Sequence, residues 1–581
     1  MEPSPCQSDG AQTDLAGRLE RLEQRLAALE RRLGMEAPPA EPSIDFAASS
    51  GETAALADSA TLAGLAGKSL LGLAAAYLLR ALTESGILPP AAGVGLGLLY
   101  ASAWLVWAAR APAAEELTVS LRALTSALIL GPLLWEAHLR FQATTSWQTA
   151  GLLILFSCTA LAISWRKNLT AVALIGSLAG LVISAALLIR THDVVPYGSG
   201  LLALALAVEA CACLDHYLGE RWVVASFANL AVLLATYVAT RPPGSLEAYA
   251  AVTRGAALAL QLSLLLVYLA STVVRTLGRR CRISAFELAQ ASLAVVIALW
   301  GAIVVTEGHP RAVLAAGLFC TLCGALCYLV SFAFLERHAG NNRNFYSYAT
   351  FGLALLLAGS RLLAPAALRP ALWTALALGC VIAGRSSGRA LLKLHAGIFL
   401  TLALAASGLA ARAGSSFLGA APHSAPTVPP GWWWVVAGAV AAYAVMLFHR
   451  PPDTGAGLYR AAGLLLAAGG SWALAAAGTL AVAPVCRNAA GGAEIRDFCP
   501  TALTFILAVL AAGSAAGFRR WQRPELKWVA WLLVLAATYK LLVQDLQRAL
   551  AFGMVLSLLA YGALLIWMPR ILRPPAHPAT R

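Results

Sequence analysis

The stretch GAALALQLSLLLVYLASTVV (Gly255–Val274), followed by RTLGRRCRIS (Arg275–Ser284) and AFELAQASLAVVIALWGAIVV (Ala285–Val305), decides the fold of this chain. The first segment carries no charge, the second is basic, and the third is again largely apolar. A bilayer core about 30 Å thick needs about 20 helical residues to cross it. The stretch therefore predicts two membrane-spanning helices joined by a short basic turn.

The composition indicates that the whole chain follows the same plan. Of its 581 residues, 59% are hydrophobic and 12% are charged, whereas a soluble domain carries about 25% charged residues. The net charge of +14 comes from basic residues in the turns between apolar segments, where the positive-inside rule and anionic lipid headgroups account for it. We therefore expect the lipid bilayer as a partner, and we do not expect nucleic-acid binding.

We predict an all-α, polytopic transmembrane helix bundle between residues 62 and 568, with about eighteen spans by the length criterion. The predicted spans are 62–82, 91–109, 119–136, 148–165, 169–189, 198–217, 222–240, 255–274, 285–305, 312–335, 346–363, 371–384, 390–410, 431–448, 458–481, 502–518, 526–543 and 550–568. Three pairs of glycines four residues apart are candidate sites of close helix contact: Gly93/Gly97, Gly176/Gly180 and Gly513/Gly517.

Basic residues concentrate in alternate turns, which predicts the orientation. The turn 275–284 carries four arginines, whereas the opposite turns hold mostly single ones, such as Arg190 and Arg311. The positive-inside rule then places both termini, including the tail 569–581, in the cytoplasm of a cell with the protein in its inner membrane. The two longest connectors, 411–430 and 482–500, are predicted outside and are too short for a folded domain.

The amino-terminal region predicts a short cytoplasmic coiled coil. Residues 1–14 are polar and expected to be disordered. Leucines recur at alternating intervals of four and three over Leu15–Leu33, and Arg18 and Glu23 fall at the g and e positions that pair in a parallel coil. The pattern favours self-association into a homo-oligomer, with an amphipathic helix packed on the protein as the alternative. Residues 34–61, which contain three prolines before residue 43, are predicted to be a flexible linker.

Ionisable residues inside spans are candidate functional sites, because charge is costly in a membrane. Arg80 and Glu84 are four residues apart on one helix face, as an ion pair or as anchors near the span's end. Glu209 is the deepest carboxylate, and Asp215 lies near the inner end of the same span. Two interpretations of Glu209 stay open, a proton or cation site and a neutral carboxyl bonded to a neighbouring helix.

Lys540 and Asp545 form a further candidate site. Five residues apart, they are not expected to share the face of an α-helix. Gln544 and Arg548 are better spaced as helix partners. The alternatives are an ion pair between helices and a contact with a substrate.

Two of the cysteines are candidates for a disulfide bond. Cys486 and Cys499 both lie in the predicted outer connector, where an oxidising compartment would allow a disulfide. Cys320, Cys323 and Cys327 share one helix face, but the apolar run favours core packing over a soft-metal site. Neither a phosphate-binding loop nor a zinc or serine-hydrolase motif is present, so we predict no metal, cofactor or catalytic residue.

Three stretches resemble a bacterial family of predicted multi-pass membrane proteins classified as a domain of unknown function. They are the leucine-rich coil Leu15–Leu33, the segment VALIGSLAG (Val172–Gly180) and the segment KLLVQDL (Lys540–Leu546) before the last span. The resemblance implies an amino-terminal coil, a proline-bearing tether and many membrane helices. The family has no established activity, so the resemblance implies no functional residue.

Three functions are compatible with these features. The first is transport of a small molecule or lipid through Glu209, Lys540 or Asp545, which would then face a shared cavity. The second is a non-enzymatic membrane scaffold that self-associates through the coil. The third is a membrane-embedded transferase. Size and buried charge favour transport, and the chain is not expected to be an enzyme.

Overall fold

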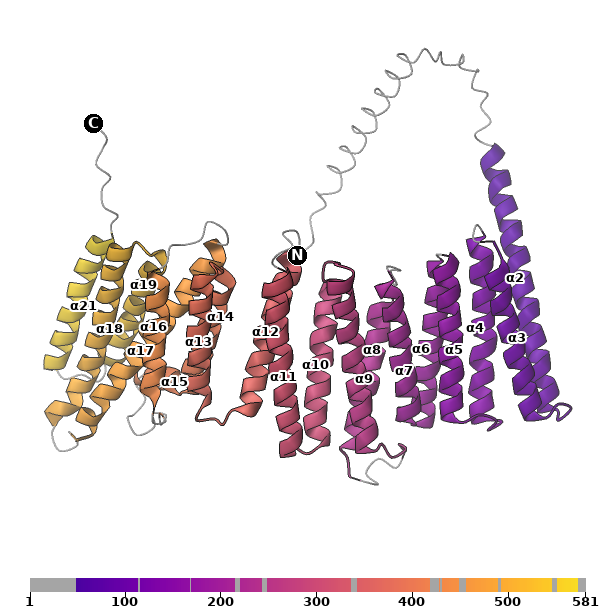
Figure 1. Ribbon diagram of the computed structural model, residues 1–581, viewed down its shortest axis with the longest axis horizontal. Coiled ribbons are helices and arrows are strands. Elements are labelled where there is room, and N and C mark those ends of the chain that lie inside the picture. Colours follow the sequence, from indigo (N-terminus) through magenta and orange to yellow (C-terminus); the bar gives the residue numbers. More distant parts are fainter. Residues whose placement is uncertain are drawn as a thin grey trace, which may run out of the picture. The chain divides into compact units, whose positions relative to one another are not determined.

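The chain is helical throughout the part that the structure, a computed structural model, describes (Figure 1). That part comprises residues 49–112, 115–167, 169–214, 220–242, 248–335, 342–417, 428, 431–448, 456–488, 493–545 and 551–572. The chain divides into two compact units, Met1–Leu130 and Gly131–Arg581. The predicted coil, residues 15–33, lies outside the described residues.

The first unit contains α2 (Ser49–Glu84), α3 (Pro90–Arg110) and the first part of α4 (Glu116–Leu139). The second unit continues with α5 (Ser146–Lys167), α6 (Thr170–Thr191), α7 (Val194–Cys213), α8 (Arg221–Ala239), α9 (Arg254–Val273), α10 (Ala285–Val305), α11 (Pro310–Val330) and α12 (Asn342–Leu363). It ends with α13 (Arg369–Ser386), α14 (Ala390–Ala406), α15 (Leu409–Phe417), α16 (Trp432–Leu447), α17 (Ala456–Asn488), α18 (Ala493–Trp521), α19 (Pro524–Lys540) and α21 (Ala551–Leu572). Short π-helices follow three of these helices: η1 (Val274–Gly278), η2 (Ser331–Leu335) and η3 (Leu541–Asp545).

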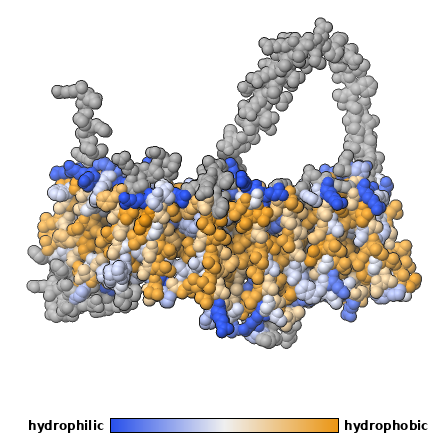
Figure 2. Space-filling view, viewed as in Figure 1, coloured by the Kyte–Doolittle hydropathy of each residue, from blue (hydrophilic) through white to orange (hydrophobic). Residues whose placement is uncertain are grey.

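Many of these helices have the length and hydropathy of membrane spans. Among the described residues, thirteen qualify, with 19 to 26 residues each, and a helix rises about 1.5 Å per residue. Hydrophobic side chains cover the middle of the helices and hydrophilic ones gather at both ends (Figure 2). The chain is therefore a multi-pass membrane protein. Each predicted span overlaps an α-helix, and the span 390–410 overlaps both α14 and α15. The count of about eighteen crossings stays a prediction.

Two boundaries differ from those expected. Helix α2 begins at Ser49, inside the predicted linker, because the alanine- and leucine-rich sequence before residue 62 favours a helix. The outer connector predicted over residues 482–500 is mostly helical, since α17 continues to Asn488 and α18 begins at Ala493. The segment after Ala406 contains α15, which makes an angle of 68° with α14.

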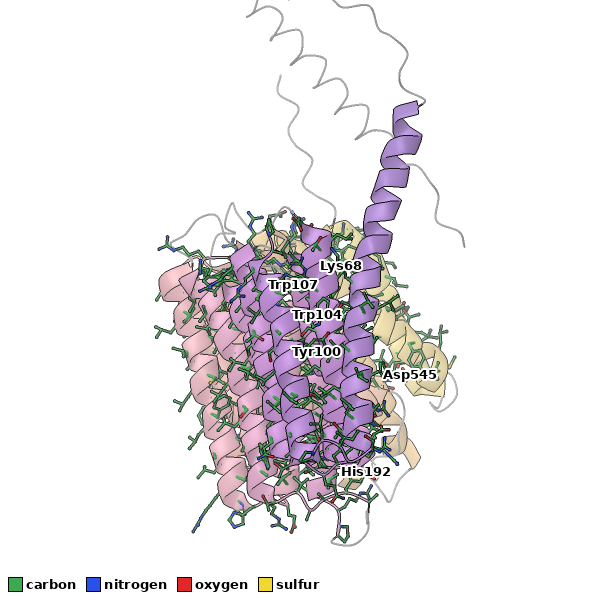
Figure 3. All side chains as sticks on the ribbon, turned by 90° about the vertical axis from the view of Figure 1, so that its right-hand side faces the viewer. Lys68, Tyr100, Trp104, Trp107, His192 and Asp545 are labelled. Atoms are coloured by element: carbon green, nitrogen blue, oxygen red, sulfur yellow. The ribbon has the colours of Figure 1, made fainter. Side chains whose placement is uncertain are left out.

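Within the first unit, aromatic residues of α3 (Figure 3) fill the space beside small residues of α2. A side chain at Gly72 would collide with the indole of Trp104, and the Tyr100 hydroxyl donates to the Gly72 carbonyl at 3.1 Å. Arg122 of α4 lies with its guanidinium carbon 4.2 Å from the centre of the Trp107 ring. This cation–π contact explains how an arginine is tolerated inside a predicted span.

Glycine contacts of the predicted kind join α5 and α6. A Cβ atom at Gly176 would lie 2.4 Å from the Ala160 Cβ, and one at Gly180 would lie 2.2 Å from the Ser157 Oγ. The Ser157 hydroxyl donates to the Gly176 carbonyl at 3.0 Å. The prediction is wrong at Gly513, where a Cβ would meet no atom within 4 Å, because this glycine does not face a neighbouring helix.

Helices α11 and α12 approach even more closely, at glycines seven residues apart. A Cβ at Gly352 would lie 3.0 Å from the Gly324 carbonyl oxygen, and one at Gly359 would lie 2.9 Å from the Gly317 carbonyl oxygen. These contacts are with backbone atoms, which cannot turn aside as a side chain can. The matching spacing on both helices therefore sets their alignment.

Helix α14 is the most enclosed helix of the carboxy-terminal group. It contacts α13, α15, α16 and α17, and Thr401 is its one exposed residue before Ala405. Leu400, Ala403 and Phe399 lie in the apolar core that these helices share. A second core joins α6 to α10. Cys320, Cys323 and Cys327 pack among apolar residues of α9 to α12.

Candidate functional site

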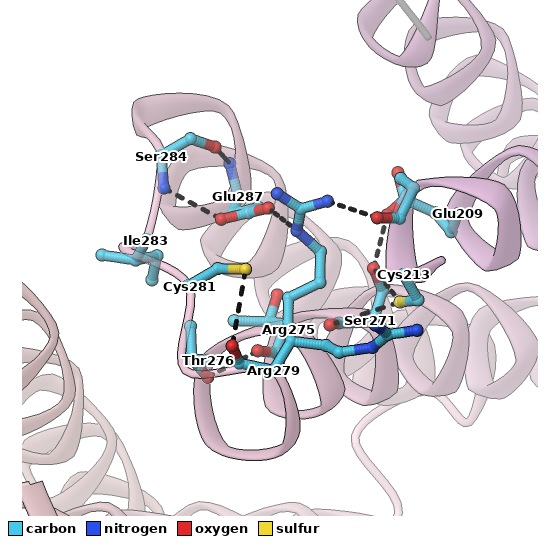
Figure 4. A network of polar contacts seen from close by, with 12 residues as sticks. Glu209, Cys213, Ser271, Arg275, Thr276, Arg279, Cys281, Ile283, Ser284 and Glu287 are labelled. Carbon is cyan, nitrogen blue, oxygen red and sulfur yellow. Dashed lines mark hydrogen bonds and ion pairs between the residues drawn. The ribbon is translucent and has the colours of Figure 1, made fainter. Parts of the chain in front are cut away.

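A buried charge network joins the same end of helices α7 to α10 (Figure 4). Glu209 lies one turn before the end of α7, and Arg221 begins α8. The Arg221 guanidinium donates to both oxygens of Glu209, from Nε at 3.1 Å and from Nη2 at 2.7 Å. The Ser271 hydroxyl of α9 donates to Glu209 Oε2 at 2.5 Å. Glu209 and Arg221 are both buried.

A second acid and base complete the network. Glu287 Oε1 lies 3.5 Å from Arg221 Nη1 and 2.5 Å from Arg275 Nε. Glu287 Oε2 accepts from the Ser284 amide, and Ser284 Oγ accepts from the Glu287 amide, which forms the capping box that starts α10. Arg275 also donates to the Ala212 carbonyl near the end of α7 at 2.6 Å.

Local structure explains how these groups meet. Arg275 lies in the π-helix η1, and its neighbour Thr276 is 2.6 Å from the Tyr348 hydroxyl of α12. Asn344 of α12 holds the connector by accepting from the Ile283 amide and donating to the Cys281 carbonyl. The basic turn predicted from the sequence, residues 275–284, is therefore held by hydrogen bonds to α12.

The network gives Glu209, the deepest carboxylate in the predicted spans, a charged partner. Two carboxylates, Glu209 and Glu287, face two guanidinium groups, Arg221 and Arg275, so their formal charges balance. Glu287 meets Arg275, an arginine of the basic turn, in a buried position. A buried pair of this kind is held by mutual attraction and hydrogen bonds, and both oxygens of Glu209 accept hydrogen bonds from Arg221 or Ser271.

Amide pairs continue this polar contact into the helices. Asn229 and Gln290 exchange two hydrogen bonds of 3.0 Å between α8 and α10. Toward the opposite end of α8 and α9, Gln261 donates to the Thr236 hydroxyl at 2.8 Å. Such side-chain bonds hold helices together where lipid tails provide no hydrophobic driving force.

Lys540 and Asp545 form a second closed site, by which we mean a buried site whose charged groups bond to one another. Their contact differs from the prediction that residues five apart do not share a helix face. Lys540 Nζ donates to Asp545 Oδ1 at 2.6 Å and to Thr504 Oγ1 at 2.8 Å, and Thr504 Oγ1 donates to Asp545 Oδ2 at 2.6 Å. Asp545 ends η3, and π-helical winding brings residues five apart together. Lys540 and Asp545 are fully buried. Gln544 and Arg548, which seemed better spaced, lie outside the described side chains.

The remaining predicted residues have separate outcomes. Arg80 Nε donates to Glu84 at 2.8 Å on the partly exposed surface of α2, as their spacing predicted. Asp215 lies outside the described residues. The side chains of Cys486 and Cys499 are likewise outside them, so the disulfide stays a prediction. The closed sites at Glu209 and Lys540 involve different helices, α7 to α10 and α18 with α19.

A third group was missed by the sequence analysis. We call Lys393, Tyr443, Tyr459, Arg523 and Glu525 the Lys393 cluster. Lys393 is fully buried, and its Nζ makes no hydrogen bond with any described residue. It lies 4.7 Å from the centre of the Tyr459 ring. The sequence contains a signal for this cluster, because Lys393 falls inside the predicted span 390–410, where a charged residue is a candidate functional site.

Arg523 organises the rest of the Lys393 cluster. Its Nη1 donates to the Tyr459 hydroxyl at 3.2 Å and its Nη2 to the Leu447 carbonyl at 3.1 Å. The Tyr443 hydroxyl is buried and has no hydrogen-bond partner in the described part of the chain. Glu525 is also buried and lies against Gly463. This cluster therefore differs from the two closed sites in leaving polar groups unmatched.

Comparison with known proteins gives no relative for this chain: no protein-family model, curated protein or solved structure matches it. The resemblance to a family of predicted membrane proteins therefore stays a prediction. In the described residues, no group of three or more histidine, cysteine or acidic side chains is arranged to hold a metal ion.

Proposed function

We propose that this protein is a transport protein of the inner membrane, with both termini in the cytoplasm, and that helices α13 to α19 move a small molecule or a lipid. The observation that carries the proposal is the break between α14 and α15. The two helices meet at 68° around Ser407 and Gly408. Discontinuous helices in the middle of a bundle form the substrate sites of many transporters.

The surroundings of α14 support the proposal. The helix is enclosed by protein on nearly all sides, and Gly408 has a φ of 74°, which glycine adopts without strain. Ser407 Oγ accepts from the Leu409 amide across the bend at 3.3 Å. Lys393, in the first turn of the helix, has an ammonium with no hydrogen-bond partner among the described residues. Interrupted backbone is tolerated at membrane depth where protein or a water-filled path surrounds it.

Thiol accessibility tests the proposal. In a chain with its eleven native cysteines replaced by alanine, Ala396→Cys and Ala403→Cys place single thiols at fully buried positions of α14. If α14 lines a path, a charged maleimide in the water phase labels them, because only a hydrated thiol ionises and reacts. Thr401→Cys, on the exposed face of α14, is the matched control and should stay unlabelled in lipid. No labelling of either buried position from either side would contradict transport through this bundle.

A membrane scaffold is the second candidate function, favoured by the closed charge networks around Glu209 and Lys540. Self-association through the coil would bring copies of the chain together. A Leu22→Cys thiol, at a core position of the heptad, should cross-link between copies in the membrane. Gln24→Cys, on the outer face of the same heptad, is the control. Equal cross-linking at both positions, or none at Leu22, would count against the coil.

A further inference from the structure

We propose that the Lys393 cluster is a binding site for an oxyanion of the phosphate class, carried by a lipid headgroup or by a free phosphate. The first argument is the ammonium of Lys393. It is fully buried, and its one described close contact of polar character is the face of Tyr459, at 4.7 Å. A buried charge without hydrogen bonds is strongly unfavourable, so an acceptor supplied from outside the chain would stabilise it.

The second argument is a second unmatched donor in the same place. The Tyr443 hydroxyl, from α16, is buried without a hydrogen-bond partner among the described residues. Tyr443 packs against the apolar core that contains Tyr459, whose hydroxyl accepts from Arg523 at 3.2 Å. Lys393 and Arg523 both approach the Tyr459 ring, with Lys393 Nζ 4.7 Å and Arg523 Cζ 5.7 Å from its centre. An oxyanion has several acceptor oxygens, and it can therefore receive hydrogen bonds from an ammonium and a hydroxyl together.

The third argument is the orientation of the helices. Lys393 lies in the first turn of α14, Tyr459 in the first turn of α17, and Arg523 immediately before α19. Three helix amino-terminal ends therefore meet at the Lys393 cluster, and each carries a partial positive charge. The first residue of α14 has no side-chain cap. Amino-terminal ends with free amides are favourable positions for phosphate groups.

The charges of the cluster leave room for an anion. Among the described residues of the cluster, two are cations, Lys393 and Arg523, and one is a carboxylate, Glu525. Arg389 precedes α14, is partly exposed at the helix end and lies over the Phe332 ring at 4.6 Å. An anion would enter from that end, one helical turn from Lys393. The inference goes beyond transport, because a scaffold could hold a lipid in the same site.

Thermal unfolding of the full chain tests the site in two arms. In neutral detergent, inorganic phosphate is titrated at constant ionic strength against chloride. In nanodiscs, phosphatidylcholine alone is compared with phosphatidylcholine containing phosphatidylglycerol. A rise in unfolding temperature with phosphate identifies a free oxyanion, and a rise only with phosphatidylglycerol identifies a headgroup. No rise in either arm overturns the proposal.

Three variants link the effect to the cluster. Lys393→Met should abolish the anion-dependent rise without lowering the unfolding temperature of the anion-free protein, because no hydrogen bond is lost. Tyr443→Phe should weaken anion binding roughly tenfold. Lys540→Met, at a closed site, should lower the unfolding temperature and retain the rise. An unchanged anion effect in either Lys393→Met or Tyr443→Phe overturns the proposal, so a folding failure of one variant leaves the other decisive.

Discussion

At the scale of single residues, the clearest feature is the closed triangle of Lys540, Thr504 and Asp545. Each side chain contacts the other two, and neither Lys540 nor Asp545 is exposed. Removing one partner leaves a buried charge that nothing neutralises, whereas removing both leaves an apolar contact. The same reasoning applies to Arg221, whose guanidinium lies between Glu209 and Glu287.

We predict that Lys540→Met and Asp545→Leu each lower the free energy of unfolding by about 3–5 kcal/mol. The double variant should lose clearly less than the sum, because it contains no unpaired charge. Unfolding by denaturant in detergent measures all four proteins in a double-mutant cycle. As a control, Arg254→Met breaks the exposed pair with Glu307 and should change stability by about 1 kcal/mol or less. Additive losses in the cycle would mean that Lys540 and Asp545 do not depend on one another.

At the scale of elements, glycines fix how α11 and α12 pack. Gly324 faces Gly352, and Gly317 faces Gly359. Side chains are absent from both helices at these points, so backbone meets backbone and dispersion contacts are close. The π-helices η1 and η3 have a related role, because each turns the end of a span so that Arg275 or Asp545 reaches its buried partners.

Gly359→Ala should therefore lower the free energy of unfolding by about 1–3 kcal/mol, as overpacking does. The added Cβ would lie 2.8 Å from the Thr321 amide nitrogen and 2.9 Å from the Gly317 carbonyl oxygen. Gly513→Ala is the matched control, because its Cβ would meet nothing within 4 Å. It should leave stability unchanged or raise it by up to about 1 kcal/mol through helix propensity. A loss at Gly513 equal to that at Gly359 would refute the packing argument.

At the scale of the whole molecule, the distribution of basic residues predicts the orientation in the membrane. The Lys393 cluster is predicted at the cytoplasmic ends of its helices, with the basic segment around Arg523. The Glu209 network lies at the ends that also carry the basic turn 275–284, which is predicted on the same side. An excess of arginine and lysine in these turns opposes their transfer across the membrane.

Reporter fusions check this orientation. Fusions after Arg282 and after Arg523 should be active only with a cytoplasmic reporter, and a fusion after Gly308, in the turn between α10 and α11, only with an external one. Alkaline phosphatase and a fluorescent protein form a suitable pair, because each is active on one side. External activity at Arg282 or Arg523 would reverse the predicted topology.

The sequence by itself determined the class of this protein and the position of its helices. Twenty-residue apolar segments such as Gly255–Val274 need no partner to be identified, because bilayer thickness and helical rise set their length. It also determined the helix-surface pair of Arg80 and Glu84, since residues four apart on one helix are neighbours before any tertiary contact forms.

Only the tertiary structure decided what the buried charges do. Glu209 and Arg221 are twelve residues apart on different helices, and Lys540 reaches Asp545 because of a π-helical turn. Lys393 has no hydrogen-bond partner among the described residues because the helices around it bring the Tyr459 ring to its ammonium rather than an acceptor. Hydropathy records that a residue is charged, but pairing depends on which helix faces are in contact. That contact is a property of the packed bundle rather than of any one segment.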